Sequence, residues 1–288
     1  MATIREIRRR IRSVQNTAKI TKAMELVAAS KMRRAQQRAL AGRPYAERLN
    51  WVLADLAETL AQMDPATVHP LLQRREVRNV GVVLITPNRG LCGGLPTSVN
   101  RRASAVVLDA GVPAKLVAVG RKGRDFFRRA NVELRAEFTE LTDYPEYQEV
   151  LPVGRVIIDD YLAGEFDRVF IVYPYFLNTM TQEPRVHQLL PVEPPAEAAT
   201  QAVDYIYEPD RAAVLAELLP RYVEMQIYEA ILEGIASEQS ARMVAMRNAS
   251  EAADEMIQDL TLSYNKARQE QITKELLDIV GGAAGLER

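Results

Sequence analysis

The stretch best suited to chemistry is the glycine-rich segment 89–94, Arg-Gly-Leu-Cys-Gly-Gly. It follows a run of aliphatic, mostly β-branched residues, 80–86, which predicts a buried strand, and it precedes a segment typical of a helix. A strand, a glycine-rich turn and a helix can hold phosphate groups at the helix N-terminus. The segment matches neither the G-x-x-x-x-G-K-[ST] nor the G-x-G-x-x-G spacing, so a tight strand-to-helix connection is the simpler interpretation.

Cys92 lies inside this turn and is the only cysteine of the chain. A cysteine nucleophile needs a nearby base, and the only two histidines, His69 and His187, fall in a predicted loop and a predicted edge strand. One cysteine and two histidines are also too few for a zinc cage. We therefore predict an inert Cys92 and no metal site.

Acidic residues do not suggest a catalytic pair either. General acid–base chemistry needs carboxylates that converge in a cleft, whereas many acids of this chain follow predicted helix faces: Glu229, Glu233, Glu251, Asp254 and Glu255. A solvated helix face explains that spacing. The sequence thus predicts no catalytic residue, no cofactor and no independent enzyme.

Charge is divided unevenly along the chain, although the formal net charge is -1. Between Arg5 and Arg48 the only acidic residues are Glu6, Glu25 and Glu47, among many arginines and lysines. Such a basic segment predicts an acidic partner. A basic coiled-coil protein that binds nucleic acid and a basic helix beside an acidic protein surface both fit this pattern.

The two ends of the chain predict long helices. Residues 2 to about 60 are rich in helix-forming residues, with a break or kink expected at Gly42 and Pro44, and the segment from about Asp210 to Leu286 continues a helical pattern through Pro220. Apolar or small residues recur in steps of three and four, which indicates a coiled-coil seam. The N-terminal seam comprises Ile4, Ile7, Ile11, Val14, Ala18, Thr21, Ala28, Met32, Ala35 and Ala39; the C-terminal seam comprises Leu218, Tyr222, Met225, Leu232, Ala236, Met243, Met246, Ala253, Ile257, Leu260 and Tyr264.

Between these helices the sequence alternates strand and helix patterns, which indicates an α/β layer with a partly parallel sheet. Strands are expected at 80–86, 115–120, 132–138, 169–173 and 186–192, the last at an edge because prolines flank it. The predicted fold is a Rossmann-like α/β domain inserted into a long antiparallel coiled coil. We expect an N-terminal shaft helix at 1–62, an α/β foot domain at 76–195 and a C-terminal shaft helix at 208–288. Asp210 is the expected N-cap.

Three longer segments and the glycine turn at 89–93 together resemble the gamma subunit of F-type ATP synthases. The segments are 11–31 (IRSVQNTAKITKAMELVAASK), 237–246 (SEQSARMVAM) and 265–284 (NKARQ, then ITKELLDIVGGAA). The resemblance follows the whole chain in order. It implies a central-stalk rotor subunit that carries torque from the membrane c-ring to the catalytic β subunits and has no catalytic residues of its own.

The resemblance also implies partners, contact residues and a location. Lys22, Met24 and Arg242 match a segment that faces an acidic loop of the β subunit, and Gln269, Thr273 and Glu275 match positions where the shaft meets the α/β subunit ring. Tyr205, Tyr207 and Glu208 match the segment that contacts the c-ring, where the epsilon subunit also lies. The acidic partner would then be protein and not nucleic acid. The chain would be a peripheral membrane protein on the cytoplasmic face of a bacterial plasma membrane, or on the matrix face in mitochondria.

One position departs from the family pattern. An acidic residue usually precedes the arginine of the glycine turn, and here that residue is Asn88. We therefore expect no ionic role for the turn. Thiol regulation, which in the plastid form depends on an inserted cysteine-bearing segment, is not expected from Cys92 alone.

Overall fold

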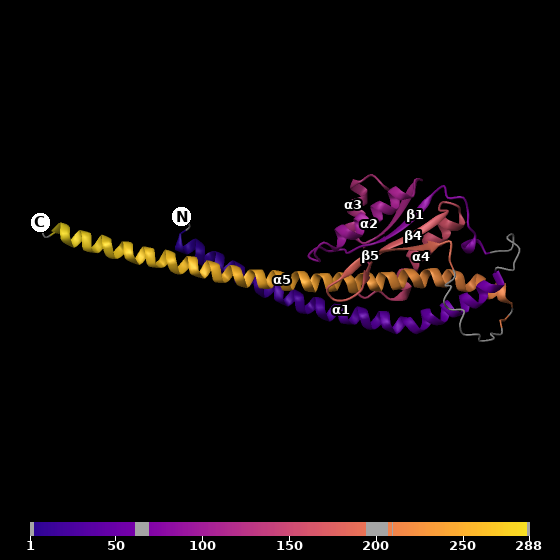
Figure 1. The fold of residues 1–288 in the computed structure, drawn as a ribbon, viewed down its shortest axis with the longest axis horizontal. Helices are drawn as coiled ribbons and strands as arrows, with labels where there is room; N and C mark the ends of the chain where they lie inside the picture. Colours follow the sequence, from indigo (N-terminus) through magenta and orange to yellow (C-terminus); the bar gives the residue numbers. More distant parts are fainter. Residues whose placement is uncertain (1–2, 61–68, 194–206, 209, 287–288) are drawn as a thin grey trace. The chain divides into compact units, whose positions relative to one another are not determined.

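The computed structural model describes residues 3–60, 69–193, 207–208 and 210–286 (Figure 1). The chain divides into two compact units. The helix-pair unit consists of Met1–Val27 and Met243–Arg288, and the sheet unit consists of Ala28–Arg242. Two long helices, α1 (Ile4–Leu60) and α5 (Arg211–Leu286), contribute residues to both units.

In the helix-pair unit, α1 and α5 run antiparallel. The side chain of Thr21 lies 2.7 Å from that of Ser250, and Arg8 Nη2 donates to Tyr264 Oη at 2.7 Å. The α5 partner therefore moves toward the C-terminus as the α1 residue moves toward the N-terminus. Buried and half-buried positions follow steps of three and four on both helices: Ile4, Ile7, Ile11, Val14, Ala18, Thr21 and Glu25 on α1, and Met243, Met246, Ser250, Ala253, Ile257, Leu260, Tyr264 and Ala267 on α5. This spacing confirms the predicted coiled-coil seam.

The sheet unit contains a five-stranded sheet in the order β3-β2-β1-β4-β5. Its strands are β1 (Val80–Ile85), β2 (Ala114–Val119), β3 (Glu133–Phe138), β4 (Arg168–Phe176) and β5 (Gln182–Leu190). The first four pair in parallel, and β5 pairs with β4 in the antiparallel direction at the edge. The predicted mixed sheet is confirmed. The strand β5 begins at Gln182, four residues before its predicted start. Its pairing with β4 continues past Pro184, which lies opposite Pro174.

Helices cover both faces of this sheet. Strand residues alternate between the two faces, so Val82 and Leu84 of β1 pack with Val99 of α2 (Leu95–Asp109) and Phe127 of α3 (Arg121–Arg129). On the other face, Val83 and Ile85 belong to a larger core with three helices. That core draws on α4 (Tyr147–Leu162), α5 and α1, and the short 3₁₀ helix η2 (Pro70–Leu72) adds Leu71. The result is a three-layer α/β arrangement.

Local signals explain where the long helices begin and continue. Asp210 accepts a hydrogen bond at 2.8 Å from the backbone N–H of Ala213, as expected for an N-cap. The expected break near Gly42 and Pro44 is absent: α1 continues as one helix through both residues. Proline removes one backbone donor, and tertiary packing of Leu49 and Leu53, which are 5% and 2% exposed, helps to hold this part of α1.

Gly120 provides a test of the sheet unit. It precedes α3 with φ at 106°, and an added Cβ would overlap the backbone carbonyl of Thr86. We expect Gly120→Ala to lower the free energy of unfolding by about 3 kcal/mol or more, because neither strand end can move without breaking β1–β2 pairing. Urea denaturation followed by circular dichroism measures this.

The matched control is Gly90→Ala. An added Cβ at Gly90 meets nothing within 4 Å. We expect this variant to stay within about 0.5 kcal/mol of the parent. Equal losses for the two variants would contradict the assigned role of Gly120.

Candidate partner-contact surfaces

A polar layer interrupts the apolar seam of the helix-pair unit. Thr21 and Ser250, which are 9% and 7% exposed, share a hydrogen bond across the seam. One turn further along α1, the Glu25 carboxylate accepts from Lys22 Nζ at 2.9 Å and from Arg247 Nε at 3.2 Å. The hydrogen bond with Lys22 lowers the pKa of Glu25, although burial opposes this shift. Polar seam groups that are all paired favour one register of the two helices.

Lys22 and Met24 lie on α1 beside this layer. The Lys22 side chain is 60% exposed although its ammonium group is bound to Glu25, and Met24 is half-buried. Three apolar residues of the same turns face away from the seam: Ile20, Leu26 and Val27 are 60%, 63% and 54% exposed. Exposed apolar residues next to a cation are typical of a protein-contact surface.

Arg242 belongs to the sheet unit and lies largely within it. Its side chain is 11% exposed, with Nη1 2.8 Å from Glu238 Oε1 and Nη2 3.2 Å from the carbonyl of Gly90. Burial raises the pKa of Glu238, and the Arg242 charge opposes that shift. Arg242 thus joins α5 to the glycine turn after β1.

The glycine turn itself is built from backbone constraints. Leu91 and Gly93 have φ values of 64° and 61°. Asn88 Oδ1 accepts from the backbone N–H of Arg121 at 3.0 Å, so it supports the start of α3. The backbone N–H groups of Lys122 and Gly123 are also bonded, to Pro87 and Thr86. These bonds hold the segment between β1 and the glycine turn against the start of α3, which favours a structural connection.

Cys92 is 1% exposed, and its burial raises the pKa of the thiol. The charged groups that act on it are Arg242, Glu238 and Lys122, and neither His69 nor His187 is among them. A protonated, buried thiol is a poor nucleophile. This geometry fits the expectation of an inert residue.

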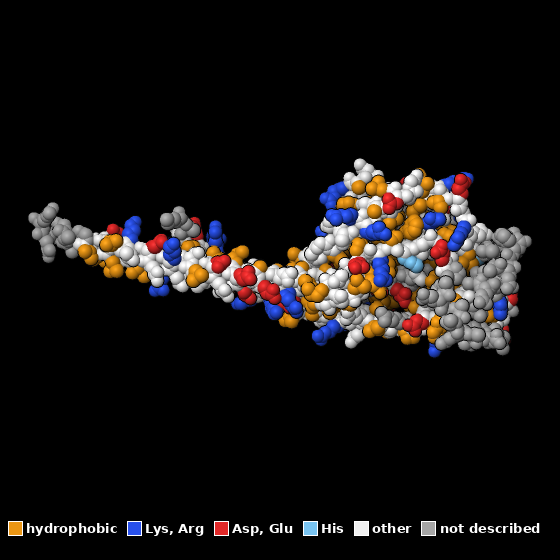
Figure 2. All heavy atoms as spheres, viewed as in Figure 1, with side chains coloured by type: hydrophobic (Ala, Val, Ile, Leu, Met, Phe, Trp, Pro, Cys, Tyr) orange, Lys and Arg blue, Asp and Glu red, His pale blue; other side chains and the backbone are white. Residues whose placement is uncertain are grey.

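The C-terminal part of α5 carries the remaining predicted shaft contacts. Gln269, Thr273 and Glu275 are exposed, and Gln271 donates to Glu275 at 2.8 Å. Every residue from 271 to 280 is exposed, so this stretch has no helix packed on it within the described chain. Figure 2 shows apolar side chains along this end of α5. Large apolar residues here include Ile272, Leu276, Leu277, Ile279 and Val280, from 46% to 69% exposed.

The third predicted set falls at the start of α5. Tyr205 lies outside the described residues. Tyr207 is half-buried, with the guanidinium carbon of Arg211 5.3 Å from its ring centre, and Glu208 is exposed. The structure therefore presents Glu208 to solvent and uses Tyr207 partly for packing.

Nothing in the described part of the chain has the arrangement of a metal centre: no group of three or more His, Cys, Asp or Glu side chains is suitably placed. Across residues 3–60, 69–193, 207–208 and 210–286, no helix is both long and apolar enough to cross a membrane. A long antiparallel helix pair, an inserted α/β layer and exposed helical surfaces define a stalk protein that works through contacts with other proteins.

Comparisons with known proteins agree with this class. The family model described as ATP synthase matches residues 3–286. The ATP synthase gamma chain of Dehalococcoides mccartyi (strain CBDB1) is 57% identical over 99% of this chain and 100% of its own length. A chain of the central stalk/c-ring structure of the Tetrahymena thermophila mitochondrial ATP synthase is 25% identical, with a TM-score of 0.61 over 80% of this chain and 99% of that chain. A chain of the Euglena gracilis mitochondrial enzyme has the same fold, at 21% identity and a TM-score of 0.67, over 98% of this chain and 94% of that chain.

The chain belongs to the ATP synthase gamma chain family. It is a non-catalytic subunit of the ATP synthase complex and part of its F1 central stalk. The predicted family and rotor role are confirmed, and the nucleic-acid-binding alternative is without support.

Two structural features were not predicted from the sequence. Glu25 occupies a seam position, but it was left out of the predicted seam because it is not apolar. The steps of four and three from Thr21 to Glu25 and from Glu25 to Ala28 were the only signal for it. The exposed Ile20, Leu26 and Val27 lie off the seam, where an apolar residue is itself a signal of a partner.

Glu25 leads to a prediction of how the stability of the helix pair depends on pH. Its pKa in the folded chain is below the value of about 4.3 expected when unfolded, so its stabilising effect is complete above that value and is lost as pH falls through the folded pKa. We expect Glu25→Gln to destabilise the helix pair by about 1–2 kcal/mol near neutral pH, because Lys22 and Arg247 lose their shared charged acceptor. The difference should shrink toward about pH 4 and below.

Thermal melting of the full chain at several pH values, followed by circular dichroism at 222 nm, measures this difference. Glu251→Gln is the control, because Glu251 is exposed on α5 of the same unit. A Glu25→Gln effect that does not change with pH would contradict the role of its charge.

Proposed function

We propose that this rotor chain carries its torque between a membrane c-ring and a ring of alternating α and β subunits. In this proposal, residues 1–62 and 208–288 form the shaft and residues 76–195 form the foot. The epsilon subunit and the c-ring bind the foot end. The complex lies on the cytoplasmic face of a bacterial plasma membrane, or on the matrix face in a mitochondrion.

The observation that supports torque transmission best is the polar layer in the antiparallel seam. Sliding one helix along the other would separate Thr21 from Ser250 and leave Glu25 without Arg247. Leaving a buried polar group without a partner costs about 1–3 kcal/mol. Slippage under load would therefore be opposed by specific bonds as well as by apolar packing.

The exposed residues supply the proposed contacts with the ring. Lys22 and Met24, with the apolar residues Ile20, Leu26 and Val27 beside them, form a surface suited to an acidic loop with apolar neighbours. Arg242 stays in the proposed contact set. Because its guanidinium also binds Glu238 and Gly90, we propose that it acts in part by holding the glycine turn against α5.

The proposed contacts at the C-terminal end of α5 are Gln269, Thr273 and Glu275, which are exposed and can be changed without disturbing a core. At the start of α5 the proposed c-ring contacts are Tyr205, Tyr207 and Glu208. Of these, the exposed Glu208 is best placed for polar recognition.

A reconstituted complex tests the rotor proposal. The chain is combined with α and β subunits, the remaining subunits and lipid vesicles, and ATP hydrolysis and ATP-driven proton pumping are measured together. We expect the combined variant Gln269→Ala, Thr273→Ala and Glu275→Ala to lower pumping per ATP hydrolysed by about threefold or more, because contacts made during rotation are lost.

The control is the pair Glu270→Ala and Lys274→Ala on the neighbouring face of the same exposed helix. It should retain coupling within about twofold. ATP hydrolysis that does not depend on adding this chain would contradict the proposed role. Equal losses of coupling in the two combined variants would contradict the proposed contacts.

A further inference from the structure

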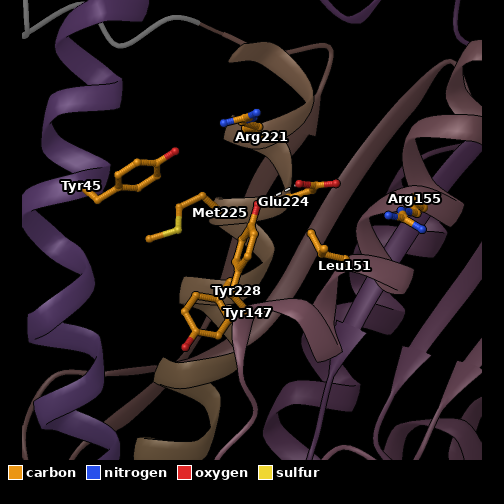
Figure 3. A pocket seen from close by; sticks show the side chains of 8 residues that line it. All are labelled: Tyr45, Tyr147, Leu151, Arg155, Arg221, Glu224, Met225 and Tyr228. Atoms are coloured by element: carbon orange, nitrogen blue, oxygen red, sulfur yellow. Dashed lines mark hydrogen bonds between the residues drawn. The ribbon is translucent and has the colours of Figure 1, made fainter. Parts of the chain in front are cut away.

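A cavity of about 480 Å³ lies within the sheet unit, between α1, α4 and α5 (Figure 3). One wall is a row of α4 side chains, Tyr147, Leu151 and Arg155, which are spaced by four residues and therefore share a helix face. Its volume falls within the range of small-molecule sites, about 300–1,000 Å³. None of the predicted ring or c-ring contact residues lines this cavity, although Met225 belongs to the predicted seam of the C-terminal helix.

The opposite wall comes from α5. Arg221, Glu224, Met225 and Tyr228 follow the three- and four-residue steps of one helix face. Tyr45 of α1 closes the third side, and Figure 3 shows its ring directed toward the Met225 side chain. The hollow thus collects three tyrosines from three different helices.

Two glycines bring these helices close together beside the cavity. A Cβ on Gly154 of α4 would lie 2.8 Å from Glu224 Cγ, and a Cβ on Gly42 of α1 would lie 3.4 Å from Met225 Cε. The helices therefore pack closely at the glycines, while the larger side chains next to them frame an opening.

Specific bonds hold the walls in position. The Tyr147 hydroxyl donates to Glu224 Oε2 at 2.8 Å, and the Tyr147 and Tyr228 rings meet edge to face, with centres 5.7 Å apart. Burial, and then the bond to Glu224, raise the pKa of Tyr147, so it remains a neutral donor. An aromatic wall that is already held in place loses little freedom when a ligand binds.

The charges at the cavity favour an anion. Arg155 is exposed and has no carboxylate partner among the described residues. Arg221 pairs with Glu217 at 2.8 Å, but both side chains are more than half exposed, so that bond costs little to exchange. Glu224 accepts a hydrogen bond from Tyr147 and remains a carboxylate, so the lining holds two cationic side chains and one anionic side chain. A cation in the tyrosine cage would meet both arginines, which disfavours the cation–π alternative.

We propose that this cavity binds an aromatic anion, with its flat apolar body against Tyr45, Tyr147 and Tyr228 and its acidic group at Arg155, the cation of the lining without a carboxylate partner among the described residues, while Arg221 adds positive charge. The ligand class includes small aromatic carboxylates, sulfonates and phosphates. The site lies outside the rotor contacts, so the proposal goes beyond the rotor function and does not depend on it.

Fluorescence titration of the full-length chain with 8-anilinonaphthalene-1-sulfonate tests the proposal, and N-phenyl-1-naphthylamine serves as the neutral analogue. We expect saturable binding of the sulfonate with one site, and binding of the neutral analogue at least about tenfold weaker, because it lacks the arginine-bound group. The combined variant Arg155→Gln and Arg221→Gln should weaken sulfonate binding by about tenfold.

Three controls make the result specific. Arg155→Lys with Arg221→Lys should recover most of the affinity, whereas Leu151→Glu should abolish the saturable phase by placing an acid in the cavity. Arg101→Gln with Arg102→Gln removes two exposed arginines of α2 and should change nothing. All variants must retain the parent melting profile. Absence of saturable binding, equal binding of the neutral analogue, or equal weakening by the α2 control would overturn the proposal.

Discussion

The repeated steps of three and four residues in α1 and α5 are the constraint on which the helix-pair unit depends. A unit of two helices has no third layer, so each seam residue is covered only by the partner helix. A shift of one residue would turn the buried row toward solvent. Thr21, Ser250 and Glu25 strengthen this constraint, because their hydrogen bonds form in one register and not in its neighbours. Packing and paired polar groups together therefore favour one register of the two helices.

In the sheet unit, the glycine turn and Cys92 have structural roles. The residues between β1 and the glycine turn, Thr86, Pro87 and Asn88, accept hydrogen bonds from the first backbone donors of α3. The Gly90 carbonyl in the turn accepts from Arg242 of α5. This connection therefore joins β1, α3 and α5 in one unit. Cys92 is also buried in this unit, beside the Arg242 and Glu238 pair, and its burial raises the pKa of the thiol and keeps it protonated.

The proposed contacts of this chain are exposed side chains on long helices. Lys22 stays 60% exposed while Glu25 restrains its ammonium group, and Ile20, Leu26 and Val27 stand outside a seam that holds their backbone. The C-terminal part of α5 offers apolar and polar side chains with no partner helix in the described chain. The tyrosine-lined cavity is different, because side chains of three helices line one open hollow whose volume suits a small ligand better than a protein surface.

The sequence by itself determined the element order, the mixed sheet, the Asp210 cap and the antiparallel helix pair, because hydrophobic periodicity and capping are local signals. Its long motifs also determined the family. Only the tertiary structure decided that Glu25 is a seam residue, that Arg242 turns inward to Gly90, and that Tyr45, Tyr147 and Tyr228 surround one cavity. Each of these depends on side chains far apart in sequence meeting in space, and periodicity along one helix carries no information about which residue of another helix lies opposite. The continuity of α1 through Pro44 has the same origin, since packing against distant residues outweighs a local propensity to break.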